Sequence, residues 1–133
     1  MSFIYFNANP KQKHVGDCVI RAISTAFGES WEKIYTDIVI LGFDRKDILS
    51  SNSLWMSYLK QRGLRREIIP DTCSDCYTIN DFMIDHPEGR FIVGTGTHVV
   101  AVIDGNLYDT WDSGDEVPIY FWSIRSENHA LDE

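Results

Sequence analysis

The feature that most constrains the fold is a change in the spacing of the apolar residues near Arg90. Before this point apolar residues recur every three or four positions, which is typical of helices with one buried face. From Arg90 onward the apolar runs are short, rich in β-branched and aromatic residues, and separated by Gly, Asp, Asn and Pro, which is typical of strands. Helices followed by strands predict an α+β fold, with N-terminal helices packed on one side of a C-terminal antiparallel sheet.

Capping and stop residues give approximate bounds for four helices. The first is expected to begin after Asp17 as N-cap and to stop at Gly28, and the second to begin after Ser30 and to end at Gly42. A third helix is expected around residues 54–59, and a short fourth one after Thr78. The expected strands are residues 3–6, as a short edge strand, and residues 64–70, 90–94, 97–103, 106–112 and 118–124.

Length and composition predict one folded domain. The chain has 133 residues, of which 44% are hydrophobic and 13% aromatic, enough to build a core without disulfides or metal staples. No internal repeat or linker interrupts it. We expect residues 1–126 to form a single domain and residues 127–133 to form an acidic C-terminal tail.

Charge and hydropathy exclude several classes of partner. Twenty acidic residues against twelve basic ones give a formal net charge of −8, which argues against binding to nucleic acid through phosphate contacts. No apolar stretch approaches the length of a membrane span, and the N-terminus lacks the pattern of a secretion signal. We therefore expect a cytoplasmic protein that binds neither nucleic acid nor membrane; its oligomeric state is not predicted.

Cys18 occupies an unusual position for a cysteine. Three cysteines, an odd number, in a chain without a secretion signal are expected to be reduced thiols. Cys18 follows Asp17 at the first turn of the first expected helix, where the positive end of the helix dipole stabilises a thiolate. A small core residue is the alternative interpretation, but core cysteines seldom lie at a helix start. Cys18 is the candidate nucleophile.

A thiol nucleophile needs a base, and His98 is the best candidate among four histidines. His129 falls in the tail, His86 ends a short helix, and His14 is in a loop, whereas His98 opens a strong strand. The Asp-Gly pair after that strand marks a tight hairpin, which brings the following residues back beside His98.

The length of the hairpin loop decides which aspartate orients His98. A three-residue loop, residues 104–106, places Asp112 directly across from His98 on the same face. A two-residue loop shifts the register by one, puts Trp111 opposite His98, and leaves Asp112 diagonal and Asp109 farther along. We predict Asp112 as the partner, with Asp109 as the alternative.

An oxyanion donor completes the expected site. Gln12 stands six residues before Cys18. Its side-chain amide, together with the backbone N–H of Cys18, is expected to bracket the oxygen that becomes negative when a thiolate attacks a carbonyl.

These residues resemble a known pattern. Gln12, four intervening residues, "DC" opening an apolar helix, and a distant His that opens a hairpin ending in Asp are similar to the papain-like cysteine peptidases. The likeness covers about residues 9–122 and is nearest to small bacterial and phage members and to bacteriocin-leader peptidases. It implies a papain-like fold in which Cys18 is the nucleophile, His98 the base and acid, Asp112 its orienting partner and Gln12 the oxyanion donor. It also implies that Trp111 shields the His-Asp pair from water.

The chain also departs from papain itself. Val19 replaces the aromatic residue that follows the nucleophile there, and the shorter chain implies a reduced substrate cleft. We expect a hydrolase that cleaves a peptide, isopeptide or related amide bond, with a protein or peptide as substrate. The alternatives are a transglutaminase-like acyl transferase with the same triad, and an inactive papain-fold module that binds a protein and has an ordinary thiol at Cys18.

No cofactor or metal is expected. Cys73 and Cys76 lie in "TCSDCY", but a zinc site needs four ligands and no second cysteine pair is present, so that His86 or His129 would have to complete it. A redox role is disfavoured because the pair does not connect a strand to a helix. Both cysteines are expected to be loop thiols. A set of seven aromatic residues could line a groove but is expected to lie mostly in the core: Trp55, Tyr58, Tyr108, Trp111, Tyr120, Phe121 and Trp122.

Overall fold

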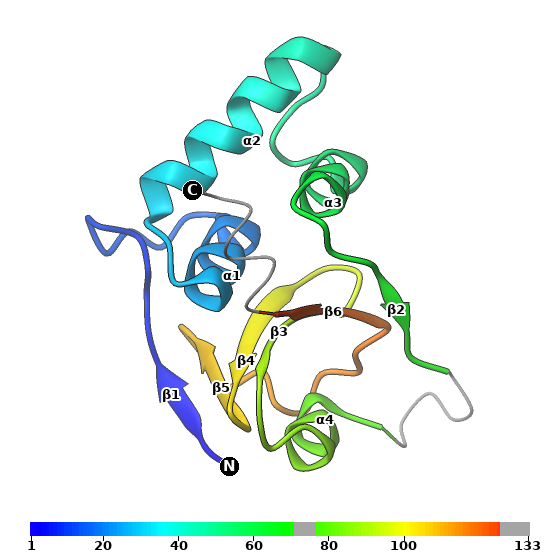
Figure 1. The fold of residues 1–133 in the computed structure, drawn as a ribbon. Coiled ribbons are helices and arrows are strands. Elements are labelled where there is room, and N and C mark those ends of the chain that lie inside the picture. The colour runs from blue at the N-terminus through cyan, green and yellow to red at the C-terminus, as the bar shows by residue number, and fades with distance from the viewer. Residues whose placement is uncertain (71–76, 126–133) are drawn as a thin grey trace.

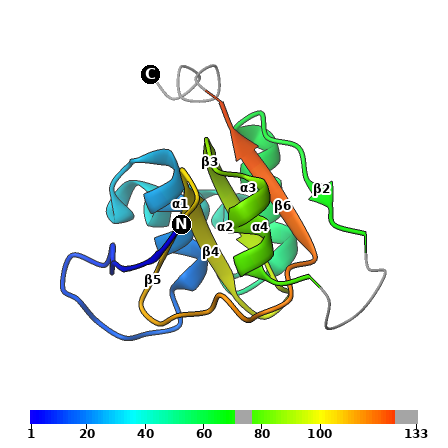
Figure 2. The ribbon, with the colours of Figure 1, turned by 90° about the horizontal axis from the view of Figure 1, so that it is seen from below.

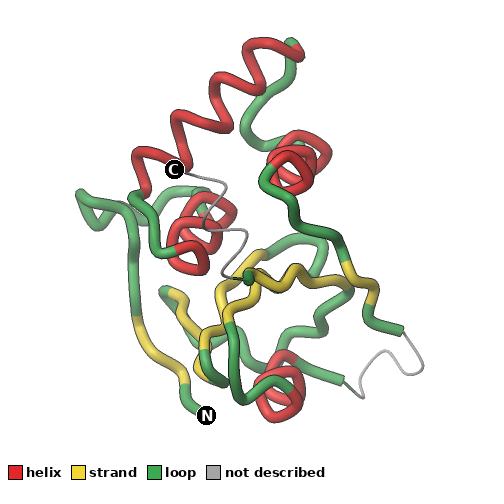
Figure 3. The backbone as a smooth tube through the Cα atoms, in the orientation of Figure 1, coloured by secondary structure: helices red, strands yellow, loops and turns green. Residues whose placement is uncertain are grey.

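The computed structural model describes residues 1–70 and 77–125, and within them the chain forms four helices and a six-stranded sheet (Figures 1 and 3). The helices are α1 (Cys18–Phe27), α2 (Trp31–Arg45), α3 (Asn52–Gln61) and α4 (Ile79–Asp85). The strands are β1 (Phe3–Tyr5), β2 (Glu67–Ile68), β3 (Arg90–Gly94), β4 (Val99–Ile103), β5 (Asn106–Asp109) and β6 (Tyr120–Ile124). The expected α+β class is confirmed.

The sheet has the strand order β1-β5-β4-β3-β6-β2. All neighbours pair antiparallel except β1 and β5, which run parallel with Phe3 opposite Leu107 and Tyr5 opposite Asp109. The first strand is therefore an edge strand, as expected. It pairs with β5, which lies about 100 positions later in the sequence. Residues 6–17 form the long loop that leads from β1 to the start of α1 (Figure 3).

Local capping explains where most helices begin and end. Gly28 ends α1 in the left-handed conformation at φ 71°, Ser30 accepts a hydrogen bond from the Lys33 N–H at the start of α2, and Thr78 forms a capping box with Asp81 at the start of α4. The expected end of α2 at Gly42 is wrong, because the helix continues to Arg45. A Cβ on Gly42 would lie 2.9 Å from the Asp47 carbonyl oxygen, so this glycine allows close packing and does not stop the helix.

The two faces of the sheet bury two separate clusters of apolar side chains. Helices α1, α2 and α3 pack on one face, where they bury residues such as Ile92 and Ala101. Helix α4 packs on the other face, against Phe91, Val93 and Val100 (Figure 2). The expectation that all helices lie on one side is therefore wrong for α4. Every residue of β4 is buried, which is the pattern of a strand covered on both faces.

Some of the predicted features fall on residues 71–76 and 126–133. Cys73, Cys76, His129 and the expected acidic tail, residues 127–133, lie outside the described residues. Among the helices that the structure does describe, none combines the length and the apolar composition needed to cross a membrane.

Candidate active site

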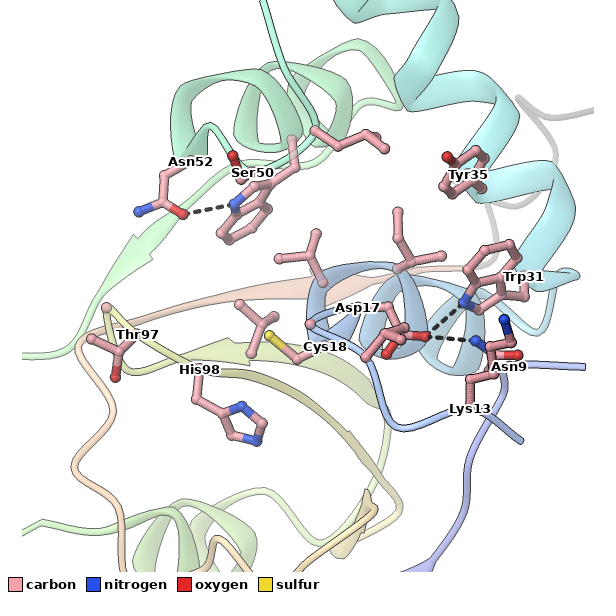
Figure 4. A pocket seen from close by; sticks show the side chains of 18 of the residues that line it. Asn9, Lys13, Asp17, Cys18, Trp31, Tyr35, Ser50, Asn52, Thr97 and His98 are labelled. Atoms are coloured by element: carbon pink, nitrogen blue, oxygen red, sulfur yellow. Dashed lines mark hydrogen bonds between the residues drawn. The ribbon is translucent and has the colours of Figure 1, made fainter. Parts of the chain in front are cut away.

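Cys18 is the first residue of α1, and its partly buried side chain faces a cleft (Figure 4). Asp17 precedes the helix, as expected for an N-cap, but its side chain makes no capping hydrogen bond. Its carboxylate instead accepts from Asn9 Nδ2 at 3.3 Å, Trp31 Nε1 at 3.0 Å and Arg21 Nε at 2.9 Å. The first N–H groups of a helix have no partner within it, and Asp17 leaves those of α1 available to the cleft.

His98 lies immediately before β4, and it lines the same cleft as Cys18. Its Nε2 is 2.7 Å from Asp109 Oδ2, and the ring lies beside the Cys18 side chain, close enough for each group to shift the pKa of the other. Because an ionised carboxylate only accepts hydrogen bonds, Nε2 carries a proton and Nδ1 is the nitrogen left for the thiol. Cys18 from α1 and His98 from the β3–β4 loop thus lie side by side, although 79 residues separate them in sequence (Figure 4).

The aspartate beside His98 is Asp109, and the prediction of Asp112 is wrong. The β4–β5 loop has only two residues, Asp104 and Gly105, both with positive φ, and it pairs Ile103 with Asn106. These are the features of a type I′ turn, for which an Asp-Gly pair is a strong sequence signal. Continued by one residue, this register sets Asp109 diagonal to His98 on the same face. The exposed Asp112 instead accepts from the Gly114 N–H at 3.1 Å.

Asp109 is buried and fully engaged. Its Oδ2 accepts from His98 and from the Ser113 hydroxyl at 2.8 Å, and its Oδ1 accepts from the Thr110 N–H at 2.7 Å and from Arg21 at 3.3 Å. Burial alone would raise the pKa of Asp109, but the hydrogen bonds from His98, Ser113 and the Thr110 backbone, together with the charge of His98, lower it. Asp109 is therefore a fixed anion that holds the imidazole in one orientation.

Gln12 is not placed as an oxyanion donor, which corrects the expectation from its spacing. Its exposed side-chain amide donates to the carbonyl oxygens of Asn7 and Asn9, at 3.1 and 2.9 Å, and it does not line the cleft. Asn9 also accepts from the Lys11 N–H through its side chain. This Asn-rich loop satisfies its polar groups locally, and the local bonds turn Gln12 away from Cys18.

The pKa values of the thiol and the imidazole move in opposite directions. Burial alone would raise the pKa of Cys18, but hydrogen bonds with the His98 side chain and the Val99 N–H, and the charges of His98 and Arg21, lower it. Burial alone would lower the pKa of His98, but hydrogen bonds with Asp109 and Cys18, and the charges of both, raise it to about 9. These shifts favour a thiolate–imidazolium pair near neutral pH.

The cleft in front of this pair has a volume of about 560 Å³. Its far wall comes from α2 and α3, where Trp31 and Tyr35 are stacked with ring centroids 4.9 Å apart and Trp55 is buried. Polar residues also line it: Lys13, Ser50, Asn52 and Thr97 (Figure 4). The aromatic residues expected in the core differ in burial: Trp55, Tyr58, Tyr120 and Trp122 are buried, Tyr108 and Phe121 are partly buried against the core, and Trp111 is exposed. The surface of the cleft is mainly apolar with a few polar groups, which is common in ligand-binding clefts.

Trp111 lies against His98, as the family resemblance implied. The two ring centroids are 5.0 Å apart with an interplanar angle of 32°, and Trp111 keeps 48% of its surface exposed. That this indole shields the hydrogen bond between His98 and Asp109 from bulk water stays a prediction.

Arg21 and Ser113 were not identified from the sequence. The spacing of Asp17 and Arg21 is that of an ion pair on one helical turn, and this signal was available. Nothing local indicates that Arg21 also reaches Asp109, or that Ser113 donates to it, because both contacts depend on how the hairpin folds back.

Within residues 1–70 and 77–125, no three His, Cys, Asp or Glu side chains are grouped so that they would hold a metal ion. Comparisons of the chain with protein-family models, with curated proteins and with solved structures find no match. The functional assignment therefore rests on the geometry of the site.

Proposed function

We propose that this protein is a cysteine hydrolase that cleaves a peptide, isopeptide or related amide bond. The observation that carries the proposal is the convergence of three residues: His98 is hydrogen-bonded to Asp109 and lies beside the Cys18 thiol, at the wall of an apolar cleft. A nucleophile, a base and a group that orients the base are the parts that covalent acyl transfer requires.

The proposed reaction has two stages, acylation of Cys18 and hydrolysis of the resulting thioester. The Cys18 thiolate attacks the amide carbonyl carbon, and the backbone N–H of Cys18 at the start of α1 donates to the resulting oxyanion. As the C–N bond breaks, the His98 imidazolium gives its proton to the leaving amine. His98 then takes a proton from the water that hydrolyses the thioester, while Asp109 stays ionised and holds the ring.

We further propose that the fold is a reduced papain-like fold. The support is the order of the parts: the nucleophile starts a helix in the N-terminal half, and the histidine and aspartate come from a later antiparallel hairpin. The lowered pKa of Cys18 favours an active enzyme over an inactive binding module, for which an ordinary thiol is expected.

The test uses a panel of peptidyl acyloxymethyl ketones, which alkylate activated thiolates, followed by peptide mapping of the adduct. The wild-type chain should be labelled at Cys18 in preference to Cys73 and Cys76, which serve as internal reference thiols. Cys18→Ala should lose this adduct, and His98→Ala should form it at least about 10²-fold more slowly, because the thiolate loses its counterion.

Product analysis then identifies the reaction. Peptide amides that match the best probe should be hydrolysed by the wild type and not by Cys18→Ala; adding a primary amine and searching for the amine adduct distinguishes transfer from hydrolysis. Equal labelling of all three cysteines would contradict the proposal.

A further inference from the structure

Among the side chains that the structure describes, only Arg21 bonds both to Asp17, which precedes the helix of Cys18, and to Asp109 in the β4–β5 hairpin. It lies on α1, one turn after Cys18. Its Nε is 2.9 Å from Asp17 Oδ1, and its Nη1 is 3.3 Å from Asp109 Oδ1 and 3.2 Å from Thr110 Oγ1. Its side chain is only 12% exposed, and the carboxylates it joins are 7% and 2% exposed.

The shape of the guanidinium suits this bridge. Nε and Nη1 point in different directions from one rigid plane, so that one side chain bonds two carboxylates that belong to different elements. Asp17 precedes α1, whereas Asp109 ends β5, and the contacts span 88 residues of sequence. A lysine at this position keeps the charge but presents a single nitrogen, which cannot reproduce both contacts at the same angles.

We propose that Arg21 is a positioning residue that locks α1 to the β4–β5 hairpin and so holds the Cys18 thiol in register with the His98 ring. This inference rests on the proposed function, because it assigns Arg21 a part in assembling that same site. Arg21 does not line the cleft, and it acts through Asp17 and Asp109.

The charges around the site give the bridge an electrostatic effect as well. Arg21 forms ion pairs with two carboxylates, those of Asp17 in the loop before α1 and of Asp109 in β5. The charges of His98 and Arg21 act on the Cys18 thiol. The charges of Asp109 and Cys18 act on His98. Without the guanidinium, two buried carboxylates would disfavour a further negative charge on Cys18. Loss of Arg21 should therefore reduce thiolate formation without removing any atom from the cleft.

The test measures the pH dependence of Cys18 alkylation by iodoacetamide from pH 4 to 10, with the adduct quantified by peptide mapping. Arg21→Gln should move the inflection upward by about one pH unit, so that alkylation well below the inflection slows about tenfold. Arg21→Lys should give an intermediate inflection, which is a partial rescue by charge alone. The matched control is Arg90→Gln, because Arg90 bonds the Thr25 and Ala26 carbonyl oxygens at the other end of the same helix.

The outcomes separate this inference from the proposed function. Arg90→Gln should unfold more easily than the wild type but keep the wild-type inflection. A folded Arg21→Gln variant with the wild-type inflection, or an equal shift in Arg90→Gln, would overturn the role of Arg21. If Arg21→Gln does not fold, Arg21→Lys decides, and a wild-type inflection there overturns the role. A wild-type inflection at the value of an ordinary thiol would instead refute the proposed function itself.

Discussion

At the scale of single residues, the site depends on how His98 is held. One ring nitrogen bonds to Asp109, the other side of the ring faces Cys18, and Trp111 covers a face of the ring. A ring restrained on three sides has lost most of its rotational freedom before any substrate arrives, so the proton transfers of the reaction need little reorganisation.

The choice of aspartate can be tested with a matched pair of variants. Asp109→Asn should lower the pKa of His98, because the ring loses its carboxylate partner, and should slow hydrolysis and thiol labelling by roughly 10²-fold. Asp112→Asn changes an exposed side chain three positions away and should stay within about twofold of the wild type. The measurements are the labelling rate and an NMR titration of the His98 ring. Equal losses in both variants would contradict the assignment of Asp109.

The residues of the site differ in how far the sequence predicts them. The sequence predicts Cys18 and His98 because one begins a strongly patterned helix and the other directly precedes a strongly patterned strand, and small errors in the bounds of these elements do not change that. The prediction of Asp112 is wrong because a change of one residue in the length of the turn changes every cross-strand partner along the strand. The prediction of Gln12 as oxyanion donor is wrong because its spacing from Cys18 does not reveal that its amide bonds to the nearby carbonyl oxygens of Asn7 and Asn9.

At the scale of the elements, α2 and α3 form the far wall of the cleft, and the loop between them is packed tightly. Gly42 in α2 faces the Asp47 carbonyl oxygen and the Leu54 side chain, for which a Cβ would lie at 2.9 and 3.0 Å. Leu49 and Ser50 from this loop, and Asn52 at the start of α3, line the cleft. The position of this wall therefore depends on a helix residue without a side chain.

Substitution at Gly42 sets helix propensity against packing. Alanine is the better helix former by about 1 kcal/mol, yet Gly42→Ala should lower the free energy of unfolding by about 1–3 kcal/mol, because the Asp47 backbone must move. Thr36→Ala introduces alanine at an exposed position of the same helix and should be neutral or slightly stabilising. Urea unfolding of both variants is the measurement. A stabilised Gly42→Ala would mean that the loop is not packed as described.

The elements themselves were predicted better than their arrangement. Residues 90–94 form the expected strand, and Thr78 caps the expected short helix. Which face of the sheet each helix covers is harder to predict, because no pattern in residues 79–85 indicates the face on which α4 packs. The clue was the unbroken apolar run of β4, in which alternate side chains must be buried on opposite faces.

At the scale of the whole molecule, the site couples folding to pH through two groups with opposite effects. Folding raises the pKa of His98 from 6.5 to about 9, so its contribution to stability is complete below about pH 6.5 and is lost as pH rises toward 9. Folding lowers the pKa of Cys18, so the contribution of the thiolate to the stability of the fold grows as pH rises over part of the same range. In the wild type the two effects oppose each other.

Removal of the thiol should expose the effect of the histidine. In Cys18→Ala the compensating thiolate is absent while Asp109 still raises the pKa of His98, so stability should fall more steeply between pH 7 and 9 than in the wild type. Urea midpoints at pH 6.5, 7.5 and 9 measure this slope. Parallel profiles for the two proteins would show that the thiol and the imidazole do not exchange a proton on folding.

The parallel pairing of β1 with β5 has a consequence for the order of events during synthesis. The Phe6 N–H donates to the Asp109 carbonyl oxygen at 2.9 Å, and Ser2 bonds to Asn106 across 104 positions. Cys18 leaves the ribosome early, whereas His98 and Asp109 emerge late. The strand β5, which ends at Asp109, is paired on both sides only after β1 has bound to it. A nascent or half-folded chain therefore carries an ordinary, weakly nucleophilic sulfur, and reactivity arrives together with the last long-range contacts.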